Sequence, residues 1–315
     1  MKRLHLMITL AASIWFLGAT TTSSQKREDP QQPETIRVDT SLVRVPVVVA
    51  DSAGRFVTGL ARSDFQITED GKPQEITTFL ATDAPFTVAL LIDTSRSTTG
   101  YLDLIRNAAI GFVKQLQPQD RVLVVTFDEK VNFLGDFTSD RGQLQRLIKG
   151  VRSNYLTRIY DAISLTIGEK LMPIKGRKAI VVFSDGVDTL SGQATYESTL
   201  DLVARSGVLV YAVQYRSPIF HDEPDRMRAQ IEKQRTASMF LRALAQQSGA
   251  RPLQVDLVEN AGRTFALVAD ELRHQYMLEY YSTNDQRDGG YHSITVRLKR
   301  NDLLVRTRPG YHSRQ

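Results

Sequence analysis

The sequence predicts an α/β protein in which a doubly wound, mostly parallel sheet is inserted in, or flanked by, a small antiparallel β-sandwich. The middle of the chain alternates short apolar runs with segments of helical spacing, as in a sheet covered by helices on both faces. The flanking segments alternate polar and apolar residues, which is typical of antiparallel strands with one exposed face. With 315 residues, 42% hydrophobic and 24% charged, the chain has room for one medium and one small globular domain.

The N-terminus has the pattern of an export signal. Lys2 and Arg3 precede an almost uninterrupted apolar run from Leu6 to Ala19, and a small polar segment follows. We therefore predict a signal peptide at 1–24, a linker at 25–35, and an exported protein that is periplasmic or secreted. A membrane span needs about 20 apolar residues, so a membrane anchor is expected only if this segment stays uncleaved. The chain contains no cysteine, which excludes a lipoprotein anchor and disulfides.

Residues 36–84 are predicted to form the first part of the β-sandwich. Asp70-Gly71 marks a hairpin, because Asp-Gly between alternating residues is the strongest short hairpin signal. Residues 275–312 have the same alternation and are expected to return to this sandwich, so that residues 86–274 form an inserted domain. The expected strands are Ile36–Asp39, Leu42–Ala50, Phe65–Ile76 with its hairpin, Gln275–Tyr281 and His292–Leu298.

Residues 86–274 alternate predicted strands and helices. Each strand is an apolar run suited to burial on both faces of a parallel sheet, and each helix spaces its apolar residues three and four apart. Strands are expected at Thr87–Ile92, Arg121–Phe127, Arg177–Phe183 and Val208–Val213. Helices are expected at Tyr101–Gln115, at Arg141–Lys149 opened by Ser139, and at Ile159–Leu171, Met239–Gln247 and Leu257–His274. Between them, the charged segment 217–236 is expected to run near the surface, with the option of a helical second half.

Oxygen-bearing side chains follow the first central strand. Asp93, Ser95 and Ser97 form the pattern Asp-x-Ser-x-Ser, and ligands of open α/β sheets bind beyond the carboxyl ends of such strands. Alternate residues of an extended loop point to the same side, so three hard ligands converge, as Mg²⁺ or Mn²⁺ requires. An isolated motif of this kind is more often a helix cap or turn. Two further segments favour the metal, because Thr157 opens a helix and Asp185 ends a second strand before a glycine.

Together these segments resemble the von Willebrand factor type A domain and its metal-ion-dependent adhesion site. The resemblance implies Ser95, Ser97 and Thr157 as hydroxyl ligands of one divalent cation, with Asp93 and Asp185 acting mostly through bound water. The loop before Thr157 departs from the family's common Gly-Gly-Thr form, because Leu156 precedes the threonine.

The flanking segments are similar to those of bacterial exported proteins called VWFA-related domain proteins. The similarity is carried by Val57–Leu60, Asp64-Phe65, Glu69–Gln74 and the closing Arg306–Tyr311. It covers nearly the whole chain after the export signal, but it implies an architecture and no particular partner.

The chemistry of the site predicts a non-enzymatic protein-binding module. A cation held by neutral hydroxyls, with carboxylates reached through water, keeps a strong attraction for an anionic ligand, and a partner protein's Asp or Glu can supply one. The loops 96–100, 155–158 and 187–193 would choose the partner. Arg96 and Arg158 either contact the incoming carboxylate or are solvated loop residues.

Two other functions stay open on the sequence. One is a structural scaffold with a degenerate, metal-free site, which Leu156 favours. The other is a metal-dependent hydrolase, although the three loops hold no His and no Glu to act as general base. Asp128, Asp161 and Asp188 are expected to be turn or first-turn residues rather than ligands.

Nucleic acid and nucleotides are not expected as partners. The basic residues are scattered apart from Arg297–Arg308, and no basic run is interleaved with stacking aromatics. The cluster at Arg297–Arg308 is better explained as the solvated face of a strand. No phosphate-binding loop and no Gly-x-Gly-x-x-Gly pattern follows a strand.

Overall fold

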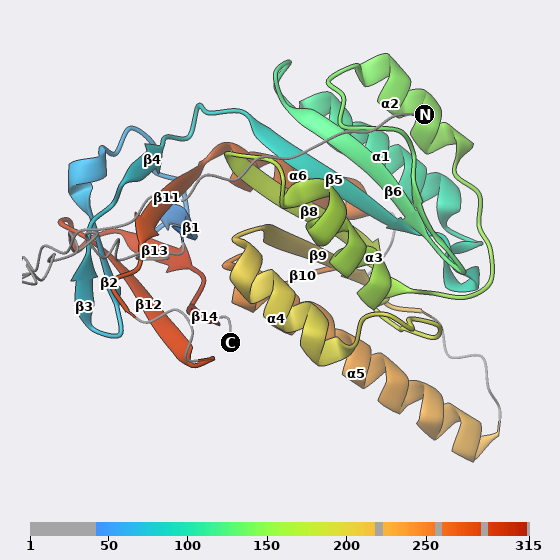
Figure 1. Ribbon diagram of the computed structural model, residues 1–315. Coiled ribbons are helices and arrows are strands. Elements are labelled where there is room, and N and C mark those ends of the chain that lie inside the picture. Colours follow the sequence, from blue (N-terminus) through green and yellow to red (C-terminus); the bar gives the residue numbers. More distant parts are fainter. Residues whose placement is uncertain (1–41, 218–222, 256–259, 285–288, 314–315) are drawn as a thin grey trace, which may run out of the picture. The chain divides into compact units, whose positions relative to one another are not determined.

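The computed structural model describes residues 42–217, 223–255, 260–284 and 289–313 (Figure 1). The predicted signal peptide at 1–24, the linker at 25–35 and the strand Ile36–Asp39 lie outside these residues and stay predictions. Within the described ranges, no helix combines the length and the apolar character that crossing a membrane requires.

The predicted parallel sheet is present and has six strands in the order β10-β9-β8-β5-β6-β7. Neighbouring strands are parallel except for β7, which runs antiparallel to β6 at one edge. The strands are β5 (Phe86–Asp93), β6 (Arg121–Phe127), β7 (Val131–Phe133), β8 (Arg177–Ser184), β9 (Leu209–Tyr215) and β10 (Leu253–Val255). Strands β7 and β10 were not predicted, because a three-residue edge strand shows too little alternation of polar and apolar residues.

Helices cover both faces of this sheet, as in a doubly wound fold (Figure 1). The buried side chains of β5 alternate between the two faces: Leu90 packs in the core with α1, α2 and α6, and Leu91 in the core with α3, α4 and α5. The helices are α1 (Leu102–Gln115), α2 (Arg141–Gly150), α3 (Ile159–Leu165) with a π-helical extension to Leu171, α4 (Tyr196–Ser206), α5 (Pro224–Ser248) and α6 (Ala261–Arg273).

Three helices differ from their predictions. Asp140, not Ser139, caps α2, since its side chain accepts a hydrogen bond from the Gln143 N–H. Helix α4 was not predicted, although Tyr196, Leu200 and Val203 pack on the core at helical spacing. Helix α5 begins at Pro224, 15 residues before the predicted Met239, so the segment 217–236 has the helical second half that the sequence left open. The fixed φ of Pro224 suits the first helical position. The first half of α5, up to Thr236, has no buried residue and therefore no apolar stripe to detect.

Two antiparallel four-stranded sheets form the β-sandwich, so the predicted fold class is confirmed. One sheet has the order β13-β1-β11-β4 and the other β14-β12-β2-β3. Their facing sides share one core, in which Val45 and Ile67 meet Leu278 and Val296. The strands are β1 (Leu42–Ala50), β2 (Phe65–Glu69), β3 (Lys72–Gln74), β4 (Thr78–Leu80), β11 (Gln275–Tyr281), β12 (Tyr291–Leu298), β13 (Leu304–Thr307) and β14 (Gly310–His312).

The chain before the parallel sheet pairs directly with the chain after it. Strand β1 lies antiparallel to β11, with Val45 opposite Leu278, and β2 lies antiparallel to β12, with Ile67 opposite Val296. Between β2 and β3, Asp70 and Gly71 both have positive φ, as a two-residue type I′ hairpin requires. These pairings support the proposal that a domain is inserted in the β-sandwich, with boundaries at 84–86 and 274–275.

A buried arginine joins the two places where the chain enters and leaves the parallel sheet. The guanidinium of Arg177, the first residue of β8, donates to the carbonyls of Thr82, Ala84 and Leu272. Thr82 and Ala84 lie just before β5, and Leu272 lies in the last turn of α6. Burial lowers the pKa of Arg177 to about 10, so the side chain stays charged near neutral pH and can hold these carbonyls.

Candidate functional site

The two aspartates predicted as ligands lie at neighbouring strand ends. Strands β5 and β8 are paired in parallel, with Ile92 opposite Phe183, so Asp93 and Asp185 emerge at the same edge of the sheet. Both are buried, Asp93 with no exposed surface and Asp185 with 6% exposed. Ser184 joins the two strand ends, because its hydroxyl donates to Oδ2 of Asp93 at 2.5 Å.

The loop after β5 folds back on itself, which brings its serines together. The Ser95 N–H donates to Oδ1 of Asp93 at 2.9 Å, and a 3₁₀ turn over Arg96–Thr98 follows. This turn places Oγ of Ser97 3.0 Å from Oγ of Ser95. Asp128 holds the loop from the end of β6 by accepting from the Thr94 hydroxyl at 2.9 Å, in keeping with the turn role predicted for it.

Electrostatics at this edge favour a cation. Burial and the neighbouring Asp185 raise the pKa of Asp93 to about 7, and burial raises the pKa of Asp185. The hydrogen-bond donors to both carboxylates within the described chain are hydroxyls and backbone N–H groups, and no Lys, Arg or His of those residues forms an ion pair with either. Two buried carboxylates with neutral partners lack a compensating charge, and a divalent cation would provide it.

The donor set fits Mg²⁺ or Mn²⁺ in kind and in spacing. All candidate ligand atoms are oxygens, which hard divalent cations prefer. Mg²⁺ binds oxygens octahedrally at about 2.0–2.1 Å, so two adjacent ligands of one ion lie about 2.9 Å apart. The distance of 3.0 Å between the Ser95 and Ser97 hydroxyl oxygens agrees with this geometry.

Thr157 is buried in a loop that lies against both other loops. Its carbonyl accepts from the N–H groups of Thr189 and Leu190, both at 3.0 Å, and its N–H donates to the Thr189 hydroxyl. On the other side, the Arg96 N–H donates to the Tyr155 carbonyl at 3.3 Å. These contacts run through the backbone. They position the loop at the site, and the role of the Thr157 hydroxyl stays a prediction.

Asp161 anchors the loop that follows Asp185. Its carboxylate accepts from the N–H groups of Gly192, Gln193 and Ala194 and from Arg158 at 3.1 Å. Burial acts to raise the pKa of Asp161, but these hydrogen bonds outweigh it and the pKa is lowered. Arg158 therefore binds a carboxylate of its own chain. It had been predicted either to contact the partner's carboxylate or to be solvated.

The end of β9 supplies two groups that the sequence analysis missed. Oη of Tyr215 lies 2.9 Å from Oγ of Ser97, and the Ser217 hydroxyl donates to Oδ2 of Asp185. The predicted strand ended at Val213, whereas β9 continues to Tyr215. A predicted strand two residues longer would have placed Tyr215 and Ser217 at the same sheet edge as Asp185.

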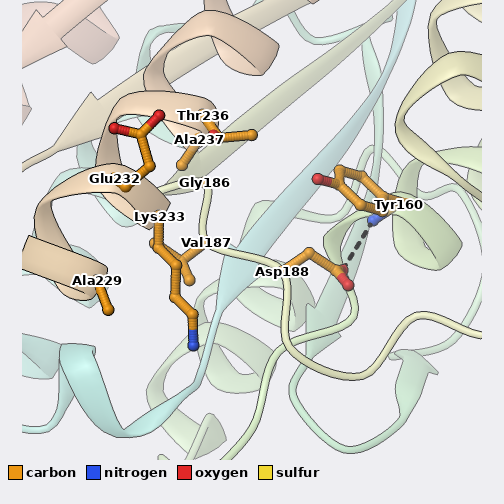
Figure 2. A pocket seen from close by; sticks show the side chains of 9 residues that line it. All are labelled: Tyr160, Gly186, Val187, Asp188, Ala229, Glu232, Lys233, Thr236 and Ala237. Atoms are coloured by element: carbon orange, nitrogen blue, oxygen red, sulfur yellow. Dashed lines mark hydrogen bonds between the residues drawn. The ribbon is translucent and has the colours of Figure 1, made fainter. Parts of the chain in front are cut away.

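A cavity of about 370 Å³ opens at the loop that directly follows Asp185 in the chain (Figure 2). One wall is the loop Gly186–Asp188, and the rest comes from Tyr160 and one side of α5. Gly186 has φ +82°, and a Cβ there would lie 2.7 Å from Cδ1 of Leu241, so only glycine fits. The lining residues are Tyr160, Gly186, Val187, Asp188, Ala229, Glu232, Lys233, Thr236 and Ala237.

A second group with metal-ligand chemistry lies in the β-sandwich. Ligand atoms of Glu69, Asp70 and His292 all lie within 4.8 Å of one another. The carboxylate of Glu69, however, already accepts from four donors, on Tyr280, Ser282, Asn284 and Tyr311. We therefore interpret this group as a polar network between β2 and the residues around it.

The comparisons with known proteins agree with the fold. Residues 88–187 match the family model of the von Willebrand factor type A domain. No curated protein matches the chain. Among solved structures, proximal thread matrix protein 1 from the mussel byssus is 14% identical, with a TM-score of 0.51, over 65% of this chain and 51% of that one.

Two bacterial structures are also similar. An aerotolerance-related membrane protein from Bacteroides fragilis is 18% identical, with a TM-score of 0.46, over 59% of this chain and 98% of that one. The vWF domain of the type V pili tip protein Mfa5 from Porphyromonas gingivalis is 14% identical, with a TM-score of 0.46, over 60% and 95%. At these identities the likeness concerns the fold alone.

Proposed function

Because the central part of this chain is a von Willebrand factor type A domain, we propose that it captures a partner protein through a divalent cation. The ligands are Asp93, Ser95, Ser97, Thr157 and Asp185, and the ion is Mg²⁺ or Mn²⁺. An Asp or Glu of the partner completes the coordination. The protein is not an enzyme in this proposal, and the export pattern at 1–24 makes it periplasmic, secreted or, if uncleaved, anchored.

The observation that carries the proposal is the pair of buried carboxylates. Asp93 and Asp185 lie at one sheet edge with neutral hydrogen-bond donors around them. Burying charges without a partner is costly, and a cation offsets that cost. Since the hydroxyl ligands add no negative charge, the ion retains attraction for a further anion.

The surroundings of the site suit a protein partner. Tyr155 is 68% exposed and Leu156 39% exposed, directly before Thr157. Exposed large apolar side chains beside a charged centre are typical of protein interfaces. The cavity at Gly186–Asp188 could take a side chain next to the partner's acidic residue (Figure 2). Small anions would use neither feature.

The two alternatives gain no support from these positions. The scaffold interpretation relied on Leu156 as a departure from the family's loop, yet this loop still contacts the other two loops through Tyr155 and Thr157. A hydrolase needs a general base near the ion. His274 stacks on Phe56, and His292 bonds Asp70 in the β-sandwich, so neither is placed for that role. His221 lies outside the described residues.

The proposal is tested by partner retention on the immobilised protein. An extract of exported proteins from the source cell would be applied in Mg²⁺, washed with EDTA, and reapplied in Mg²⁺. We expect a specific partner to bind, to leave with EDTA, and to return. Asp185→Ala should abolish retention, because the ion loses a carboxylate.

Asp201→Asn is the matched control, since Asp201 is a half-exposed carboxylate on α4 paired with Arg205. It should retain the partner as the wild type does. Retention that survives both EDTA and Asp185→Ala would contradict cation-bridged capture and favour the scaffold.

A further inference from the structure

We infer that Tyr215 is a positioning residue of the candidate metal site, whose hydroxyl fixes the direction in which the Ser97 hydroxyl faces the ion. The inference rests on the proposed function. Oη of Tyr215 lies 2.9 Å from Oγ of Ser97. Tyr215 is 1% exposed, so water does not compete for the contact.

The hydrogen-bonding capacity of Ser97 explains why this contact matters. A serine hydroxyl has one hydrogen and two lone pairs. If the Tyr215 hydroxyl donates to one lone pair of Ser97 across their 2.9 Å contact, the hydrogen and the other lone pair of Ser97 remain for its other neighbours. The second lone pair then points to the space shared with Ser95, 3.0 Å away, where a cation would bind both oxygens. Without the Tyr215 hydroxyl, the Ser97 hydroxyl can rotate away from that direction.

Tyr215 is held rigidly enough for this role. Its ring stacks on Phe183 of β8 at 5.0 Å between centroids, and Phe183 stacks in turn on Phe265 of α6 at 5.8 Å. Its position is therefore set by the core of the parallel sheet. Groups that orient metal ligands from behind typically change metal affinity by 10- to 100-fold when they are removed.

The same strand end supports the second aspartate. Ser217 donates to Asp185, and the Ser217 carbonyl accepts from Nε2 of Gln234 on α5 at 2.9 Å. The end of β9 thus acts as a fourth segment of the site, behind the three loops that carry the ligands. Tyr215 gives the sharper test, because one oxygen atom can be removed without changing its packing.

The first test is Mg²⁺ titration of the full chain by calorimetry, comparing the wild type with Tyr215→Phe. We expect affinity about tenfold weaker, with an unchanged circular dichroism spectrum. Tyr211→Phe is the control, because Tyr211 lies on the same strand and the same sheet face, is fully buried, and is far from Ser97 in the register. It should bind Mg²⁺ like the wild type.

The second test is a double-mutant cycle with Ser97→Ala. If Tyr215 acts through Ser97, Tyr215→Phe should cause no further loss in the Ser97→Ala background. Mn²⁺ is the probe if Mg²⁺ binding becomes too weak to measure. The inference would be overturned, and the proposed function left standing, by either of two results. One is wild-type Mg²⁺ affinity in Tyr215→Phe. The other is a double variant whose loss of affinity equals the sum of the two single losses. A wild type that binds neither ion would overturn the proposed function and this inference with it.

Discussion

Asp93 makes the metal-free protein sensitive to pH. A carboxyl group titrates near pH 3.9 in an unfolded chain, whereas burial and Asp185 raise the pKa of Asp93 to about 7 in the folded protein. Between these values the folded state holds a proton that the unfolded state has released. The contribution of Asp93 to stability therefore falls as pH rises from about 4 to 7 and stays low above that.

This predicts that, at pH 8, the order of stability of the wild type and Asp93→Asn reverses between EDTA and Mg²⁺. In EDTA the variant should be more stable, because a neutral amide replaces an uncompensated buried charge. In saturating Mg²⁺ the wild type should be the more stable of the two. When Mg²⁺ is at 100 times its Kd, binding adds about 2.7 kcal/mol to the free energy of unfolding of the wild type. Urea unfolding in both conditions decides it. A variant less stable than the wild type in EDTA would refute the electrostatic account.

At the scale of elements, the sequence predicted those strands and helices whose apolar residues form a long run or a clear spacing. The strands ending at Asp93 and Asp185 are long apolar runs, so their position and their shared sheet edge could be predicted, and the structure brings Ser95 and Ser97 to the same place. Elements with weak patterns could not. The first half of α5 buries no residue, so it has no apolar stripe. Helix α4 does place Tyr196, Leu200 and Val203 on the core at helical spacing, and it was missed despite that pattern.

The residues that position the ligands could not be predicted from a local sequence pattern either. Tyr215 and Ser217 reach Ser97 and Asp185 only because β9 pairs with β8, and that pairing joins residues about 30 positions apart or more. Asp161 was predicted as a first-turn residue, which it is. Its role in holding three N–H groups of a distant loop depends on tertiary contacts that no spacing reveals.

The turn after β8 predicts a sensitive glycine. Gly186→Ala should destabilise the protein, by about 1–2 kcal/mol from the left-handed backbone alone, with more from the Cβ placed 2.7 Å from Leu241. It should also weaken Mg²⁺ binding, because Asp185 is the preceding residue. Gly262→Ala is the control, since Gly262 lies in α6 with open space around its Cβ position. Equal stability of both variants in urea would show that the turn tolerates a side chain.

At the scale of the whole molecule, the β-sandwich depends on the chain that connects its strands. Its two sheets pair residues from before and after the parallel sheet, as Val45 with Leu278 shows. These strands can pair only when the intervening chain brings its own ends together. Arg177 contributes to that closure by holding carbonyls at both ends, and it does so at the opposite end of β8 from Asp185.

Replacing Arg177 should therefore separate stability from metal binding. Arg177→Met leaves the carbonyls of Thr82, Ala84 and Leu272 without their donor, and each buried acceptor lost costs about 1–3 kcal/mol. We expect a large loss of stability in urea and faster hydrogen exchange in β1 and β11, but an unchanged Mg²⁺ affinity. Arg121→Met is the control, because Arg121 also begins a central strand but is exposed. If Arg177→Met weakened Mg²⁺ binding as strongly as Asp185→Ala, the metal site and the junction of the two β regions would form one cooperative structure. The predicted separation of stability from metal binding would then be wrong.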